Sequence, residues 1–166
     1  MPPKVLSSEC PSSLIFPSHG HTNTGPSNGY DKVINILVDP RAQLFVVHER
    51  LLKQASHYFQ AALDGDWAEA KTKEFRLREE NADAFRLFVY YLYHNQISYT
   101  RHDDAELFLV EAYLLGERRQ AVKFKNAVID ALSNFWRNDD MRLPSLKAIM
   151  LCYNESLPDS RLRRFI

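Results

Sequence analysis

Histidine is the side chain best suited to acid–base chemistry near neutral pH, and this chain has six of them, scattered along its length. His48 stands where a β-branched run gives way to an apolar helical pattern. A catalytic base needs a nucleophile or a carboxylate as its partner, and the sequence indicates neither for His48. We therefore expect its imidazole to hydrogen-bond backbone groups at this corner. The pair His19-x-His21 predicts no more than adventitious metal binding.

Acidic side chains occur in two adjacent pairs, Asp103-Asp104 and Asp139-Asp140. Each pair lies where a predicted helix begins, and the helix dipole favours negative charge there, so capping accounts for both pairs. The two cysteines, Cys10 and Cys152, are far apart and fit no metal-binding spacing. We predict that they are free thiols of a reducing compartment.

Sequence motifs for catalysis are absent. The chain contains no dinucleotide-binding glycine motif, no P-loop, no nucleophile elbow and no zinc-protease motif. We predict that the protein is not an enzyme and that it holds neither a cofactor nor a metal ion. An uncharacterised enzyme is the alternative.

The composition favours one well-filled core: 166 residues, 45% of them apolar, with a formal net charge of zero. No apolar run approaches the roughly 18 residues of a membrane span, and the first 20 residues lack the apolar core of a secretory signal. Basic clusters occur at Arg118-Arg119 and within 161–164, and we expect the latter to be solvated or to contact Asp139-Asp140. We predict an intracellular protein, cytoplasmic or nuclear, that binds neither membranes nor nucleic acid.

Residues 33–63 change from a strand pattern to a helix pattern without a break. Two β-branched runs, 33–38 and 44–47, are joined by the turn segment 39–43, which predicts a β-hairpin. Apolar residues then recur at helical spacing, which predicts one helix of about four turns. The residues on its apolar face are Leu51, Leu52, Ala55, Tyr58, Phe59, Ala62 and Leu63. The rest of the chain is expected to cover this nucleus.

The flanking segments differ in character. Residues 1–29 are rich in proline, glycine and serine with little charge, which predicts a disordered arm. Residues 67–71 are predicted to be an irregular turn or a loop, and the alternation in 74–78 predicts a strand added to the hairpin's sheet. Asn81 is the predicted N-cap of a helix that is apolar almost all round. Such a helix lies at the centre of a core or partly faces a partner, and 97–99 is predicted to be briefly extended.

The remaining pattern is helical. Asp103 and Glu106 are spaced as a capping box for a helix over 105–119, and a further apolar stripe runs to about Trp136. A last helix begins near Pro144, which suits a first helical turn. We predict that its packed side is formed by Leu146, Ile149, Met150 and Tyr153.

The order of these elements, together with short motifs along them, resembles the BTB/POZ domain over residues 30–136. The matching positions are Asp31, Phe45-Val46-Val47-His48, Leu51-Leu52, Ser56-x-Tyr58-Phe59, Leu63-x-Gly65-x-Trp67-x-Glu69-Ala70, Phe85-x-x-Phe88-x-x-Tyr91-Leu92-Tyr93, Ala112-Tyr113-x-Leu115-Gly116 and Leu132. The tail over 149–164 is similar to the segment that follows the domain in many filamentous-fungal members. In that group the chain often continues further, so the sequence is expected to be part of a longer protein.

The resemblance implies an α+β fold, a small β-sheet capped by a cluster of α-helices. It divides the chain into a disordered arm over 1–29, a BTB/POZ domain over 30–136 and a C-terminal helical extension over 137–166.

The resemblance also implies a protein–protein interaction module that self-associates and in several branches recruits a cullin scaffold, so that a bound partner is ubiquitinated. The family's cullin-contact pattern is a bulky apolar residue, any residue, then glutamate, and Trp67-Ala68-Glu69 matches it. An exposed tryptophan beside a carboxylate is a suitable interface anchor. Two alternatives are open: Trp67 packs against the end of the preceding helix, or the chain is a BTB-like scaffold without cullin binding.

A second candidate surface comes from the same resemblance. Dimeric members line a charged pocket with an early aspartate, the histidine and a following basic residue. The corresponding residues here are Asp31, His48 and Arg50, with Glu49 standing directly after the histidine. The predicted partners are therefore other proteins, a second copy of the chain and a cullin.

Overall fold

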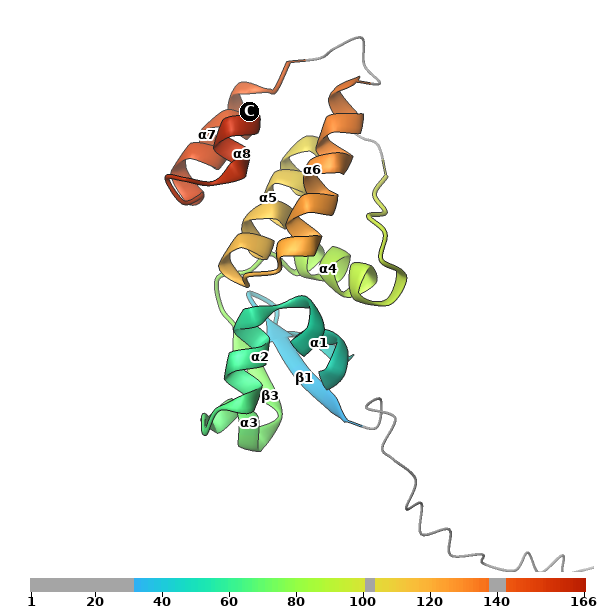
Figure 1. Cartoon of the computed structure of the whole chain (residues 1–166), viewed down its shortest axis with the longest axis vertical. Coiled ribbons are helices and arrows are strands. Elements are labelled where there is room, and N and C mark those ends of the chain that lie inside the picture. Colours follow the sequence, from blue (N-terminus) through green and yellow to red (C-terminus); the bar gives the residue numbers. More distant parts are fainter. Residues whose placement is uncertain (1–31, 101–103, 138–142) are drawn as a thin grey trace, which may run out of the picture.

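The computed structural model describes residues 32–100, 104–137 and 143–166, and Figure 1 shows the arrangement of its helices and strands. The predicted arm over 1–29 and the Asp139-Asp140 pair lie outside these residues. The elements are β1 Val33–Val38, β2 Gln43–His48, α1 Glu49–Ala55, α2 His57–Asp64, α3 Ala68–Thr72, β3 Glu74–Leu77, α4 Ala82–His94, α5 Ala105–Arg118, α6 Val122–Arg137, α7 Leu146–Glu155 and α8 Arg161–Phe165. The α+β class expected from the sequence is confirmed.

The sheet has three strands in the order β2-β1-β3. The predicted hairpin is confirmed: β1 pairs with β2 antiparallel, and β3 adds to the other side of β1 in parallel. Alternate side chains of β1 point into the core, where Ile34, Ile36 and Val38 are fully buried. At the turn, Asp39 accepts two hydrogen bonds from Arg76 of β3, which links the end of the hairpin to the third strand.

The single helix predicted over 51–63 is wrong: the structure has two helices, α1 and α2, with a break at Ser56. Ser56 has extended backbone angles, and its Oγ accepts the amide N–H of Phe59 as the N-cap of α2. The same hydroxyl donates to the carbonyl of Arg119, 63 residues later in the chain. A side chain that caps one helix and binds a distant carbonyl favours the break over a continuous helix.

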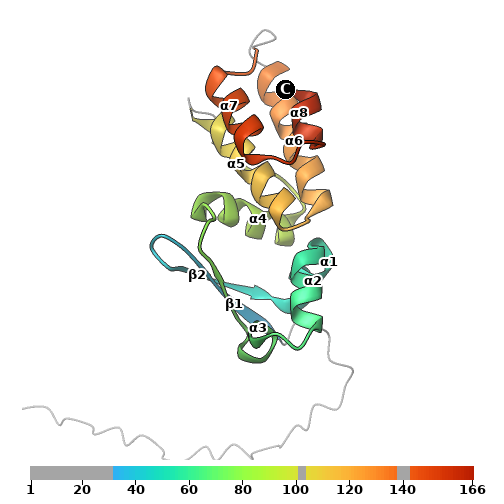
Figure 2. The same ribbon diagram turned by 90° about the vertical axis from the view of Figure 1, so that its left-hand side faces the viewer.

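Helix α4 is the central helix that the sequence predicts. It crosses between the sheet with α1 and α2 on one side and the α5–α6 pair on the other (Figures 1 and 2). Its N-cap is confirmed, because the Asn81 side chain accepts the amides of Asp83 and Ala84. Phe85 and Phe88 are fully buried, and Phe88 contacts Phe124 of α6 edge to face. These buried rings connect the part of the molecule formed by the sheet, α1 and α2 to the α5–α6 pair.

Helices α5 and α6 pack closely where α5 ends. A Cβ on Gly116 would lie 2.9 Å from side-chain atoms of both Phe124 and Lys125, so a larger residue at this position would force these side chains of α6 to shift. The capping box expected at the start of α5 rests partly on Asp103, which lies outside the described residues. Its other member, Glu106, has a different role: it is buried and accepts hydrogen bonds from the indole of Trp136 and the amide of Ser145.

The predicted packed side of α7 is wrong. Leu146, Met150 and Tyr153 are more than half exposed, Ile149 is half-buried, and the small residues Ala148 and Cys152 are the buried ones. Helix α7 packs on α5, and the small inward residues allow close approach. Burial raises the pKa of the Cys152 thiol, which fits the expected free thiol; Cys10 lies outside the described residues.

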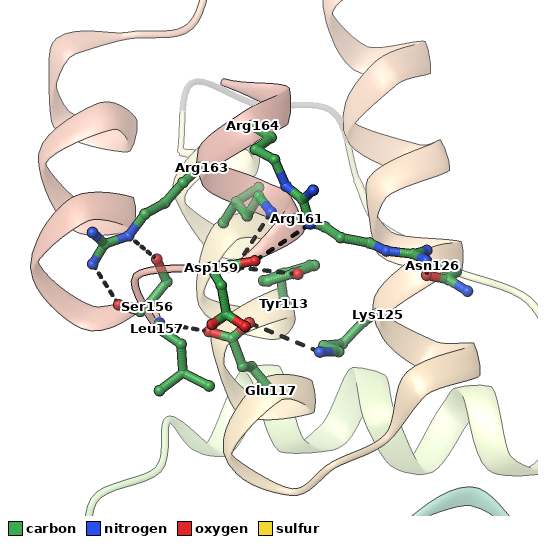
Figure 3. A network of polar contacts seen from close by, with 12 residues as sticks. Tyr113, Glu117, Lys125, Asn126, Ser156, Leu157, Asp159, Arg161, Arg163 and Arg164 are labelled. Atoms are coloured by element: carbon green, nitrogen blue, oxygen red, sulfur yellow. Dashed lines mark hydrogen bonds and ion pairs between the residues drawn. The ribbon is translucent and has the colours of Figure 1, made fainter.

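The C-terminal residues are tied to α5 and α6 by the polar network of Figure 3. The Leu157 amide donates to Glu117, and the Ser160 hydroxyl donates to the Tyr113 hydroxyl. Arg163 donates to the Ser156 side chain and to the carbonyls at the end of α7. Its positive charge is well placed at a helix C-terminus.

Two short connecting segments, 67–71 and 97–99, also had predicted conformations. The segment predicted to be an irregular turn or a loop over 67–71 contains the short helix α3, and residues 97–99 form no strand. Among the described residues, no helix is both long enough and apolar enough to span a membrane.

Candidate interaction surface

Trp67 is the most conspicuous side chain of the predicted contact pattern, because 67% of its surface is exposed. It stands at the N-cap of α3, and the exposed Glu69 lies in the first turn of that helix. An exposed indole is unusual for a residue type that is normally well buried. The two residues are therefore available to a partner from the same short helix.

Gly65 explains how the indole is held. A Cβ at this position would lie 2.7 Å from Cδ1 of Trp67 and 3.2 Å from the carbonyl oxygen of Ala61. One edge of the ring therefore packs against the backbone at the end of α2, while most of its surface is exposed to solvent. The predicted alternative, that Trp67 packs against the end of the preceding helix, holds for this edge alone.

Ion pairs hold the C-terminal end of α3 against the start of α1. Glu49, at the start of α1, pairs at 3.2 Å with both Lys53 and Lys73, and Lys53 also pairs with Asp64. Burial acts against the charge of Glu49, but hydrogen bonds from the two lysines outweigh it and lower the pKa of its carboxyl. Glu49 therefore bridges α1 to the end of α3, and Lys73 ends α3 in a left-handed conformation.

The second candidate surface is only partly described. Asp31 lies outside the described residues, and Arg50 is exposed in α1. The Nδ1 atom of the half-buried His48 lies 2.7 Å from the hydroxyl of Tyr93, 45 residues later, and the rings meet edge to face. The backbone N–H of His48 also donates to that hydroxyl, at 3.4 Å. The imidazole therefore contacts a tyrosine side chain of α4, and its expected hydrogen bond to backbone groups stays a prediction.

The solvent face of the hairpin beside His48 is apolar. Val33 of β1 pairs with His48, and Val46 and Leu44 follow on the same face of β2. Each of these three aliphatic side chains is about half exposed. Leu44 and Val46 lie on β2, an edge strand of the sheet, and an edge strand commonly pairs with another chain.

The basic clusters considered for nucleic acid are used within the fold. The carboxylate of Glu80 is fully buried and receives two hydrogen bonds from Arg118, while Arg119 pairs with it at 2.8 Å. Of the arginines expected to be solvated or to meet Asp139-Asp140, Arg161 and Arg164 are exposed to solvent, and Arg161 also donates to the Asn126 side chain. In the part of the chain that the structure describes, no three histidine, cysteine or acidic side chains gather as metal ligands.

A family model described as the BTB/POZ domain matches residues 29–131, which is more than half of the chain. The chain belongs to the BTB/POZ family. The BTB (Tramtrack and Bric a brac) domain of human gigaxonin is a similar solved structure, with 16% identity and a TM-score of 0.48, covering 77% of this chain and 100% of that one. A comparison with curated proteins finds no match.

Membership in this family makes the chain one of a group of protein–protein interaction modules. Its division into domains at residues 29 and 136 stays a prediction, although the described residues of the helical extension contribute Ala148, Cys152 and Leu162 to the same hydrophobic core.

Sequence reasoning missed two features of this BTB/POZ chain. The buried carboxylate of Glu80 follows Glu79, which is exposed, and no local signal separates the two. The second feature is the apolar stripe of α7, which the sequence predicts to pack and which the structure leaves mostly exposed. For the stripe, the small residues at 148 and 152 were the available signal, since small side chains mark close helix packing.

Proposed function

We propose that this BTB/POZ chain is an adaptor that binds a cullin scaffold through Trp67 and Glu69. The observation that carries the proposal is the 67% exposure of Trp67 beside an exposed carboxylate on α3. An indole supplies a large apolar contact at low entropic cost, and a carboxylate adds one directional contact. The fit of Trp67-Ala68-Glu69 to the family's cullin-contact pattern supports this role.

Binding of a cullin amino-terminal domain by the whole chain tests the proposal. Trp67→Ala removes the apolar anchor and Glu69→Lys reverses the charge, and both positions are exposed, so the fold is expected to persist. Tyr153→Ala is the matched control, because Tyr153 is an exposed aromatic residue on α7.

We expect each α3 variant to weaken cullin binding at least about tenfold, while the control binds as the unchanged chain does. Binding that is equal in all four proteins would assign the contact to another surface. A chain that binds no cullin at all would favour the alternative, a BTB-like interaction scaffold outside the ubiquitin system.

Self-association is a second proposed activity, supported by the half-exposed Val33, Leu44 and Val46 on the hairpin. Burying such aliphatic side chains against a second copy removes apolar surface from water. Val46→Lys places a charge in the centre of this patch. We expect it to shift the chain from dimer to monomer in light scattering, and an unchanged mass would argue against this surface.

A further inference from the structure

A hollow of about 700 Å³ lies between α4, residues 98–100 and the start of α5. This volume is within the range of ligand-binding pockets. We call the hollow the α4–α5 groove. It shares no residue with the Trp67–Glu69 surface or with the apolar patch of the hairpin.

The walls of the α4–α5 groove are aromatic and aliphatic. Tyr90 of α4 is 36% exposed, Tyr99 lines the groove from the connecting segment, and Leu107 and Phe108 of α5 are half-buried. The buried Leu87 also lines it. Tyrosine and phenylalanine faces attract cations as well as apolar groups, so these walls suit a long side chain with a charged end.

The charged residues of the groove are mainly acidic. Among the described residues that line it, Asp83, Asp104 and Glu111 are acidic and Arg86, which is paired with Asp83, is the one cation. This is a local excess of negative charge in a chain whose formal net charge is zero. A partner with a positive charge is therefore favoured over a neutral or acidic one.

The ionised carboxylate of Glu111, in the wall of the groove, destabilises the folded chain. Burial, together with the charge of Asp83, raises the pKa of its carboxyl, while Arg118 and the Asn81 side chain act in the opposite direction. Asn81 donates to it at 2.7 Å, which fixes its orientation. Arg118 is itself bound to the buried Glu80 through two hydrogen bonds, so its charge is already shared.

We propose that the α4–α5 groove binds a partner peptide through a lysine or arginine side chain flanked by apolar residues. The aliphatic stem of that side chain lies between the aromatic walls, and its charged end reaches Glu111. The N-terminal arm is a poor occupant, because residues 1–29 contain a single basic residue, Lys4. A separate basic and apolar segment supplies the complementary charge.

Selection from a random peptide library displayed on phage, against the immobilised full chain, tests this proposal. The recovered peptides are then synthesised with a fluorescent label and titrated by anisotropy, beside copies in which the basic residue is replaced by glutamine. Nonaarginine serves as a probe of charge alone.

Three variants locate the binding. Glu111→Gln removes the charge but keeps an oxygen for Asn81, and Tyr90→Ala removes an exposed wall. Glu155→Gln is the matched control, because it removes an exposed carboxylate of α7. Thermal unfolding of each variant separates loss of binding from loss of fold.

We expect the selected peptides to carry lysine or arginine beside apolar residues, and Glu111→Gln and Tyr90→Ala to weaken them about tenfold or more. Peptides in which glutamine replaces the basic residue should bind the unchanged chain as weakly as the selected peptides bind the groove variants. The control variant should bind the selected peptides as the unchanged chain does. Several results would overturn the proposal: no recovered peptide, peptides without basic residues, binding unaffected by both groove variants, or nonaarginine binding equally well. A dimer lost on Glu111→Gln would assign the groove to a second copy instead. None of these results bears on the cullin contact.

Discussion

Glu80 is the residue whose role depends most on its surroundings. Its carboxylate has no solvent exposure and is shared by Arg118 and Arg119, which come from the end of α5 and the residue after it. The guanidinium of Arg119 also lies 4.7 Å from the centre of the Tyr58 ring. Glu80 therefore connects the segment before α4, the end of α5 and helix α2.

Glu80→Ala should lower the free energy of unfolding by about 3 kcal/mol, since removing one partner of a buried ion pair leaves the other charge unpaired. Urea denaturation measures this loss. Glu79→Ala is the control, because Glu79 is exposed and its loss should change the free energy by less than about 0.5 kcal/mol. Similar losses in both variants would refute the buried-pair account.

For Glu111 we predict the opposite effect on stability: its ionised carboxylate destabilises the folded chain. Its pKa is raised in the folded chain, so the folded state binds a proton more readily than the unfolded state does. Stability contributed by this group is therefore lost as the pH rises from the ordinary glutamate pKa through the folded value. Glu111→Gln should be more stable than the unchanged chain at neutral pH, with a difference that disappears in acid.

Unfolding curves recorded across this pH range measure the effect of Glu111. The groups facing the carboxylate are Asp83, Arg118 and Asn81, and all of them are kept in the variant. A glutamine variant that is less stable at neutral pH would show that the carboxylate is structural, with no cost to offset by binding.

At the scale of single residues, the sequence predicted the local role of a residue better than the distant residues that it contacts. The Asn81 cap follows from a local pattern, whereas the sequence leaves open whether Trp67 is exposed at an interface or packs against the preceding helix. The contact of His48 with Tyr93 joins residues 45 apart, and Glu80 meets Arg118 across 38 residues. Such pairs depend on how α4 and α5 pack, which no local window contains.

The break between α1 and α2 is the clearest feature at the scale of elements. An apolar stripe continued across both helices and predicted one helix, because periodicity records which face is buried but not whether the backbone is continuous. Ser56 carries the missing information. Its hydroxyl can serve the backbone at a helix start, as it does for Phe59.

Ser56→Ala should lower the free energy of unfolding by about 1 to 2 kcal/mol, because it removes the N-cap of α2 and the hydrogen bond to the Arg119 carbonyl. Chemical denaturation is the measurement, and Ser98→Ala, at an exposed position, is the control. An unchanged midpoint in Ser56→Ala would mean that the break is set by packing alone.

Helix α7 shows the converse problem. Its sequence contains a large apolar stripe through Leu146, Met150 and Tyr153 and a small one through Ala148 and Cys152, and both keep helical spacing. Periodicity alone does not indicate which of two apolar stripes is buried. The structure buries the smaller stripe against α5 and leaves the larger one in solvent.

At the scale of the molecule, α4 joins the sheet tier to the α5–α6 pair, as Figure 2 shows. The predicted α+β architecture was correct because each main element has a strong local signal and the family resemblance supplied their arrangement. The aromatic residues of α4 form the junction: Phe85 contacts Phe45 of β2, and Phe88 and Tyr91 contact Phe124 of α6.

Phe88→Ala should lower the free energy of unfolding by about 3 to 5 kcal/mol, since Phe88 is fully buried at this junction. Thermal melting followed by circular dichroism measures the loss. Tyr90→Ala, on the exposed side of the same helix, serves as the comparison and should melt close to the unchanged chain. A normal melting curve for Phe88→Ala would contradict the central position of α4.

We propose that this BTB/POZ interaction module associates with itself and with a cullin. Light scattering of the whole chain over a dilution series, with and without a cullin amino-terminal domain, measures both associations at once. We expect a dimer whose mass increases when the cullin is added and does not increase for Trp67→Ala. A monomer whose mass is unchanged by the cullin would contradict this proposal.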